Sequence, residues 1–198
     1  MITLRNLVVS ILGGALLATP PQGFETQAER RLRLQSEALG LTLPLPQPLI
    51  KIFKGAHRLE LWSGPHRIAS HPVGLGHRGL TNKVREGDHL TPEGRFYIAS
   101  RNRQSAFHLF LGLSYPNLDA ADRGLRSGLI SKAQHHAILR AEQAHGLPPQ
   151  FTPLGGLVGI HGGGSRSDWT WGCIALENDL IEELWIACPL GTPVVIEP

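Results

Sequence analysis

The sequence predicts a mainly β fold, a mixed β-sandwich or barrel with a few helices at its periphery. Two observations support this. The 198 residues include 23 glycines and 15 prolines, so the chain is divided by many turns. Between the turns lie short apolar runs bounded by turn residues, a pattern typical of strands rather than of a helix bundle. A hydrophobic content of 41% is enough for one core, so we expect a single domain with short additions.

The first residues, 1–20, predict a signal peptide or a short apolar anchor. Arg5 precedes an apolar run at 7–18, and the breaker-rich stretch "TPPQG" follows it. The run is too short to span a bilayer, which needs roughly 20 residues. We therefore expect an exported protein of the periplasm or cell envelope, without a stable membrane span. A buried N-terminal strand is the alternative interpretation of this run.

Residues 21–47 predict an N-terminal helix and a proline-rich linker. The segment 24–40 has a helical pattern with Gly40 as its stop. "LTLPLPQP", at 41–48, is typical of an extended linker or a domain edge. The main domain is therefore expected at 48–198.

Within that domain, apolar runs alternate with turn signals such as "TPEG" at 91–94. The predicted strands are 49–55, a hairpin over 57–70, 95–100, 106–115, 157–160 and 192–197.

Two segments have a helical period instead. Residues 129–145 place alanine, leucine and isoleucine on one face, and Gly146 ends that helix. The last helix is expected to begin near Asn178 as its N-cap. Its apolar stripe consists of Ile181, Leu184, Trp185 and Cys188.

The candidate chemistry lies in "IHGGGSRSDWTWGCIALEND", residues 160–179. Cys188 belongs to an apolar helix face, so we interpret it as a core residue and expect no disulfide with Cys173. Cys173 is then a candidate nucleophile, because an imidazole such as that of His161 can take a thiol proton. Neighbouring backbone N–H groups would stabilise an oxyanion, at Trp171, Gly172 and Cys173. The alternative is an inert cysteine and a buried histidine beside a tight turn.

Other chemistries fit the residues poorly. A phosphate loop needs a helix directly after its glycines, and "HGGG" lacks the G-x-S-x-G serine of esterases. The ten histidines are scattered, with no H-E-x-x-H or C-x-x-C, so we expect neither a metal site nor a cofactor. The net charge of +3 is spread along the chain, which does not indicate nucleic-acid binding. A metal-binding periplasmic protein remains a rival hypothesis.

The residues around the cysteine resemble the catalytic signature of the L,D-transpeptidase family, the YkuD-type domain. That signature is a His-Gly pair followed by Ser/Thr-x-Gly-Cys, here His161-Gly162 and Thr170-Trp171-Gly172-Cys173. Trp171 stands where many members have histidine or another polar residue. Further segments that resemble the family lie at 72–76, 91–98 and 191–196. The resemblance covers roughly residues 48–198.

The resemblance implies an L,D-transpeptidase-like fold and a cysteine acyltransferase without a cofactor. Cys173, activated by His161, would attack a diamino-acid carbonyl in a peptidoglycan stem tetrapeptide, and the terminal D-alanine would leave. An amine of a second stem, or a lysine of a wall-linked lipoprotein, would resolve the thioester. A same-fold hydrolase that uses water, and a non-catalytic wall-binding module, are the rival functions.

The remaining site residues are given less specific roles. Orienting or oxyanion roles are expected for Gly172, Thr170 and Gly162, with Thr170 either orienting His161 or capping a turn. Substrate contacts are expected for Tyr115, Asn117 and Trp171, although Tyr-Pro-Asn is also good turn chemistry.

Overall fold

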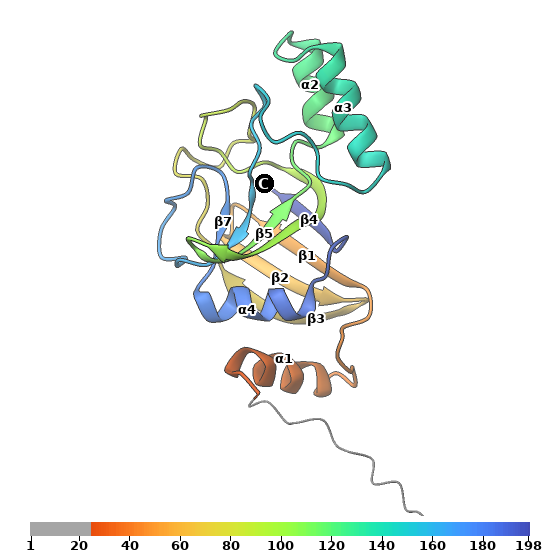
Figure 1. Ribbon diagram of the computed structural model, residues 1–198. Helices are drawn as coiled ribbons and strands as arrows, with labels where there is room; N and C mark the ends of the chain where they lie inside the picture. The colour runs from red at the N-terminus through yellow and green to blue at the C-terminus, as the bar shows by residue number, and fades with distance from the viewer. Residues whose placement is uncertain (1–24) are drawn as a thin grey trace, which may run out of the picture.

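The computed structural model describes residues 25–198, so the predicted signal segment lies outside the described residues. Eight strands form one curled, mixed sheet in the order β3-β2-β1-β8-β4-β5-β6-β7 (Figure 1). The fold class predicted from the sequence is therefore confirmed. The strands are β1 (Pro48–Phe53), β2 (Arg58–Ser63), β3 (His66–Pro72), β4 (Gly94–Ser105), β5 (His108–Leu113), β6 (Gly159–His161), β7 (Ile174–Ala175) and β8 (Pro193–Glu197).

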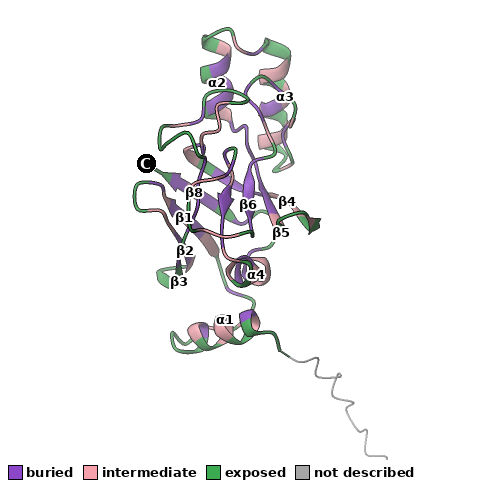
Figure 2. Cartoon of the chain, turned by 90° about the vertical axis from the view of Figure 1, so that its left-hand side faces the viewer, coloured by how far each residue is buried: buried purple, intermediate pink, exposed green. Residues whose placement is uncertain are grey.

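The last strand of the chain lies in the middle of the sheet. β8 pairs in parallel with β1 and antiparallel with β4, so Val194 is in register with both Ile50 and Phe96. Val194 and Ile196 are buried, and the residues on either side of them face outward in alternation. β8 therefore joins the N-terminal hairpin to the strands that carry the candidate site. Figure 2 shows these strands buried at the centre of the molecule.

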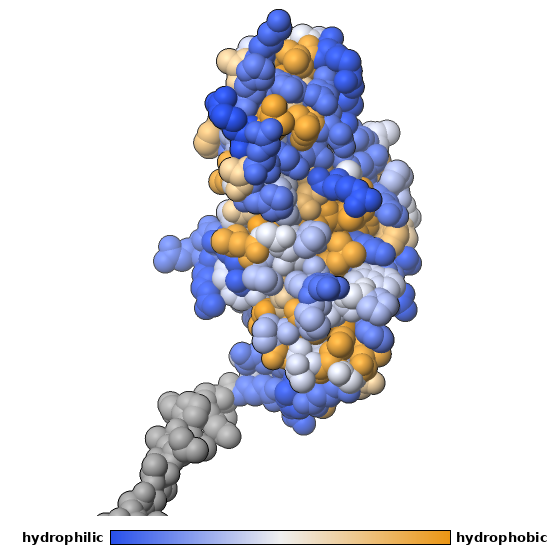
Figure 3. Space-filling view, turned by 90° about the vertical axis from the view of Figure 1, so that its right-hand side faces the viewer, coloured by the Kyte–Doolittle hydropathy of each residue, from blue (hydrophilic) through white to orange (hydrophobic). Residues whose placement is uncertain are grey.

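Within residues 25–198, four helices surround the sheet: α1 (Gln27–Glu37), α2 (Leu118–Arg126), α3 (Lys132–Gln143) and α4 (Asn178–Ala187). α4 packs against β5 and β6, and α1 packs against α4 and β3. α2 and α3 form a hairpin at the other end of the molecule (Figures 1 and 2). In Figure 3 the end that carries this hairpin is mostly hydrophilic, with small apolar patches.

Two hydrophobic clusters stabilise this arrangement. The main cluster joins the sheet to α1 and α4. A second, smaller cluster lies under the α2–α3 hairpin and consists of Ala121, Ile130, Ile138 and Leu154. Leu154 belongs to the loop between α3 and β6, so this cluster attaches that loop to the hairpin.

Two elements differ from the sequence-based expectation. α2 was not predicted, because Pro116 and Asn117 suggested a turn; Asn117 instead caps a helix, its side chain accepting from Ala120 N–H. Asn178 is the first residue of α4 rather than its N-cap, which is Glu177. The Asn178 side chain instead accepts from Gly163 N–H at 2.9 Å. No helix among residues 25–198 has the length and apolar composition needed to cross a membrane.

Candidate active site

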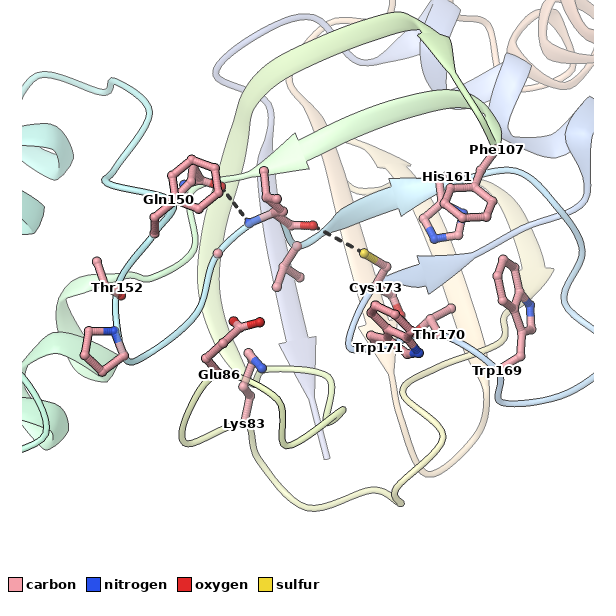
Figure 4. Close-up of a pocket in the computed structure, with 15 residues that line it drawn as sticks. Lys83, Glu86, Phe107, Gln150, Thr152, His161, Trp169, Thr170, Trp171 and Cys173 are labelled. Atoms are coloured by element: carbon pink, nitrogen blue, oxygen red, sulfur yellow. Dashed lines mark hydrogen bonds between the residues drawn. The ribbon is translucent and has the colours of Figure 1, made fainter.

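The sheet places Cys173 and His161 on one face. β6 and β7 are parallel neighbours, with His161 in register with Ala175. Cys173 lies just ahead of β7, two positions before Ala175, where a continued strand would point its side chain to the same side. Both side chains line a cavity of about 930 Å³, drawn in Figure 4.

His161 is held in one tautomer. Its Nδ1 lies 2.6 Å from the carbonyl oxygen of Gly162. A carbonyl can only accept, so Nδ1 carries the proton and Nε2 keeps its lone pair. Phe107 stacks on the imidazole with ring centroids 4.7 Å apart, and Trp169 meets its edge at 5.5 Å.

Burial favours the uncharged form of both groups. It lowers the pKa of His161, and the hydrogen bond to Gly162 opposes this in part. It raises the pKa of the Cys173 thiol to about 11, against smaller opposing effects of the Gly159 N–H and the Lys83 ammonium. The resting site at neutral pH therefore holds a thiol and a neutral imidazole, not an ion pair.

The thiol itself is free. Cys173 and Cys188 are both unpaired cysteines, as expected, and Cys188 is buried at the end of α4. The Cys173 thiol donates to the Leu157 carbonyl at 3.5 Å (Figure 4). Leu157 holds a left-handed backbone with φ of 54°, and its N–H donates to the Gln150 side chain at 2.8 Å. Gln150 thus holds the backbone of Leu157, whose carbonyl accepts from the Cys173 thiol.

Thr170 and Gly172 shape the turn before the cysteine. The Thr170 hydroxyl donates to the Cys173 carbonyl at 2.7 Å and accepts from Gly172 N–H at 3.2 Å. The alternative in which Thr170 caps a turn is therefore the one observed, rather than a contact with His161. Gly172 has φ of 126°, and an added Cβ would lie 2.7 Å from the Leu90 carbonyl. Its N–H is engaged by Thr170, which leaves those of Trp171 and Cys173 as the expected oxyanion donors.

Gly162 orients the imidazole by its carbonyl, and α4 holds the loop that follows it. A Cβ at Gly162 would lie 2.5 Å from Asn178 Oδ1 and 2.8 Å from the Phe107 carbonyl. The backbone N–H of Ser165 donates to Glu177 at 3.1 Å. The start of α4 therefore accepts hydrogen bonds from the glycine loop that follows His161.

Tyr115 and Asn117 are not on the cavity surface, which corrects their expected substrate contacts. Tyr115 is 1% exposed, and its hydroxyl donates to the Leu154 carbonyl at 2.9 Å. The Asn117 side chain is used by the α2 cap and by the Arg95 carbonyl at 3.1 Å. The polar atoms of both side chains are bonded to backbone groups. We therefore assign Tyr115 and Asn117 a structural role beside the cavity and no substrate contact.

Trp171 does line the cavity, as expected, and is 76% exposed. It stacks on His89 with ring centroids 5.5 Å apart. Sequence reasoning missed the other side chains of the wall, which come from distant loops without a motif. They include Lys83, Glu86, Phe107, Gln150, Phe151 and Leu157. Among the described residues, no three His, Cys, Asp or Glu side chains gather as a metal site would require.

The family model of the L,D-transpeptidase catalytic domain, YkuD, matches residues 47–196. The chain belongs to this family. The match includes the cysteine turn, the His161 loop and the central strand β8, so the geometry above is that of an L,D-transpeptidase domain. No curated protein sequence matches the chain.

The chain is also similar to solved structures, and those of Pgp2 share its fold. The cell shape determining protein Pgp2 of Campylobacter jejuni is 19% identical with a TM-score of 0.51, covering 86% of this chain and 55% of that chain. A mutant of Pgp2 gives 21% identity and a TM-score of 0.55, covering 77% and 47%. Bd1075 of Bdellovibrio bacteriovorus is 22% identical with a TM-score of 0.49, covering 78% and 49%. The chain thus spans about half the length of these structures.

Proposed function

We propose that this protein is a peptidoglycan L,D-transpeptidase that works through a thioester on Cys173. Family membership supports the reaction class. The observation that carries the assignment of residues is the His161–Gly162 hydrogen bond, since it leaves Nε2 as the acceptor in the cavity that also holds Cys173.

In the proposed first half-reaction, His161 Nε2 takes the thiol proton as the sulfur attacks the carbonyl of the third stem residue. The Cys173 N–H donates to the oxyanion of the tetrahedral intermediate. The C–N bond to the terminal D-alanine then breaks. The imidazolium gives its proton to the leaving amine, and a thioester with neutral His161 remains.

In the second half-reaction, the same Nε2 removes a proton from the incoming nucleophile as it attacks the thioester carbonyl. The C–S bond then breaks, and the imidazolium returns the proton to the Cys173 sulfur. An amine of another stem peptide gives a cross-link, and a lipoprotein lysine gives an attached protein. Water gives hydrolysis, the outcome expected of a same-fold carboxypeptidase or amidase. We propose the amine as acceptor, in keeping with the family.

We further propose that the protein works outside the cytoplasm, in the periplasm or cell envelope. The apolar run at 7–18 and its flanks support export, and peptidoglycan lies in that compartment. Mass determination of the protein recovered from the envelope fraction tests this. Recovery with the cytosolic fraction at full mass would contradict it.

The function is tested by incubating the protein with a disaccharide-tetrapeptide and measuring product masses. Loss of D-alanine with formation of a dimer indicates the transferase, and loss with addition of water indicates the hydrolase. Cys173→Ala and His161→Ala should each remove most turnover while thermal melting still shows a folded protein. No product and no covalent adduct on Cys173 would contradict an enzymatic function and favour a wall-binding module.

A further inference from the structure

The peptide bond between Thr170 and Trp171 belongs to the cysteine turn and carries one of the two expected oxyanion donors. That donor is the Trp171 N–H, which makes no hydrogen bond with the described part of the chain. Thr170, Trp171 and Cys173 all line the cavity, and Figure 4 shows their side chains close to one another. The contacts that hold this peptide bond therefore decide whether its N–H can serve the reaction.

The carbonyl of the same peptide bond is held by His77, a residue of the loop between β3 and β4. Thr170 O accepts from the His77 backbone N–H at 3.1 Å and from His77 Nδ1 at 3.0 Å. A carbonyl can only accept, so Nδ1 carries a proton. The peptide bond is trans, so its N–H points opposite to its C=O. The two donors of His77 thus fix the plane of the peptide and direct the Trp171 N–H away from His77.

His89 extends this chain of donors. Because Nδ1 of His77 is protonated, Nε2 of its uncharged ring accepts, and His89 Nδ1 donates to it at 3.1 Å. The His89 imidazole also lies flat against the Trp171 indole, with ring centroids 5.5 Å apart and an interplanar angle of 11°. Each donor in such a chain polarises the next, so the Trp171 N–H becomes a stronger donor.

The backbone of His89 is held in an uncommon conformation. Its φ is 55°, in the left-handed region that few residues other than glycine adopt. A Cβ added at Gly76 would lie 2.3 Å from the His89 carbonyl oxygen, so the lack of a side chain at Gly76 allows this backbone to approach. Strain of this kind is concentrated at functional sites. A glycine at position 89 would relieve it, yet the chain has an imidazole there that reaches both His77 and Trp171.

We propose that His77 is a positioning residue for the oxyanion donor at Trp171, and that His89 holds His77 in that role. This inference rests on the proposed function and goes beyond it, because neither histidine lines the cavity. When the Cys173 sulfur attacks, the substrate C=O becomes C–O⁻, and the fixed Trp171 N–H donates to that oxygen. The bond strengthens as the negative charge forms. The two histidines therefore stabilise the transition state rather than the bound substrate.

The test compares a substrate with an analogue of the tetrahedral intermediate. The analogue is a stem tripeptide that ends in an aldehyde; the Cys173 sulfur bonds to its carbonyl carbon, and the thiol proton passes to its oxygen. His77→Leu removes the side-chain donor but keeps the backbone N–H. It should weaken aldehyde binding and lower kcat about tenfold, less than the loss of a whole oxyanion donor. KM, and the affinity of the double variant His77→Leu and Cys173→Ala for the tetrapeptide, should change by less than about twofold.

Two further variants separate positioning from a general effect on the fold. His77→Asn places an amide N–H where Nδ1 lies and should restore most of the lost kcat. His66→Leu changes an exposed histidine at the start of β3 that does not line the cavity, and as the matched control it should leave both affinities unchanged. Equal losses of aldehyde and tetrapeptide affinity in His77→Leu, or no rescue by His77→Asn, would overturn the inference.

His89→Gly tests the second histidine even where His77 does not tolerate substitution. Relief of the left-handed backbone offsets the lost contacts, so thermal melting should stay close to that of the wild type. We expect kcat to fall roughly threefold, because His77 loses its donor; an unchanged kcat would show that His89 does not hold His77. If the wild-type protein neither cleaves the tetrapeptide nor binds the aldehyde, the proposed function fails and this inference with it. An active wild type with an equally active His77→Leu variant overturns this inference alone.

Discussion

Cys173 and His161 are both uncharged at neutral pH, because burial disfavours the charged form of each. The raised pKa of the thiol and the lowered pKa of the imidazole leave the proton on sulfur until a substrate arrives. In the proposed mechanism, proton transfer would therefore accompany attack, in contrast to cysteine enzymes that hold a preformed thiolate–imidazolium pair.

This state predicts the pH dependence of alkylation. Thiolate is the species that reacts with iodoacetamide, so the rate at Cys173 should rise about tenfold for each pH unit from 7 to 10. With a pKa of about 11, no plateau is expected within that range. Mass spectrometry of the modified peptide measures the rate and separates Cys173 from Cys188. A plateau near pH 8 would show that the thiolate is stabilised in the resting protein.

Thr170 offers a second prediction at the residue scale. Thr170→Val keeps the shape but removes both hydrogen bonds that the hydroxyl makes in the cysteine turn. The Gly172 N–H loses its partner, and the Cys173 carbonyl keeps only the longer bond from Thr91 at 3.5 Å. We expect a loss of about 1–3 kcal/mol in unfolding free energy. We also expect at least a tenfold fall in kcat/KM, because the nucleophile is displaced. Thr170→Ser keeps the hydroxyl and should retain most of both quantities.

Among the elements, α4 connects the glycine loop to the N-terminal helix. Its first turn binds the glycine loop that follows His161, while Glu183 in the middle of the helix is 0% exposed. Glu183 accepts from Arg31 of α1 and from His71 of β3, the latter at 2.8 Å. α1 therefore neutralises a carboxylate that is buried between α4 and the sheet.

Arg31→Met should consequently lower the unfolding free energy by about 1–3 kcal/mol. The loss of a fully buried partner costs more, but the Arg31 side chain is 37% exposed and water partly replaces it. Arg33→Met is the control on the same helix, because its partners Glu25 and Glu37 are exposed and lie in or beside α1. Denaturant unfolding curves give both values, and equal effects of the two variants would contradict a role for the buried pair.

Across the whole molecule, the loop between β3 and β4 closes one side of the cavity and depends on buried charges. Lys54, directly after β1, is 0% exposed. Its ammonium donates to the carbonyls of Thr81 and Thr91 at 3.0 and 2.9 Å and to Glu93 at 2.8 Å. Asp88 accepts from Lys83 and from the backbone N–H groups of Val84, Arg85 and Leu90. The cavity wall is thus tied to the sheet by ionic hydrogen bonds.

Asp88 makes the stability of the whole domain pH-dependent. Burial raises the pKa of its carboxyl, but the backbone N–H groups and Lys83 outweigh this and lower the pKa below its ordinary 3.8. The contribution to stability is therefore present above pH 3.8 and is lost as the pH falls through the lowered value. Asp88→Asn should be less stable by roughly 1–3 kcal/mol at pH 7. The difference should shrink below pH 4 in denaturant titrations, and a constant difference would contradict this origin.

The sequence predicted most of the strands because apolar runs and the turn residues that bound them are local signals. It missed α2 because Pro116 and Asn117 are compatible with a turn as well as with a helix start. The proposed nucleophile and base were recognisable as a motif, since the glycines beside both residues are needed for close backbone approach. The roles of Tyr115 and Asn117 were not recognisable, because each depends on backbone partners that packing brings to it.

By itself, the sequence determined a β-rich domain, a free cysteine outside the last helix and a histidine-glycine pair that we propose supplies its base. The tertiary structure decided what surrounds them: the carbonyl that sets the imidazole tautomer, the hydroxyl that holds the cysteine turn, and the opposite charges of Lys83 and Glu86. The physical reason is that strand and turn preferences act between neighbours in the chain. Burial, pKa and cavity shape arise instead from contacts between segments far apart in sequence, which exist only after the sheet has closed.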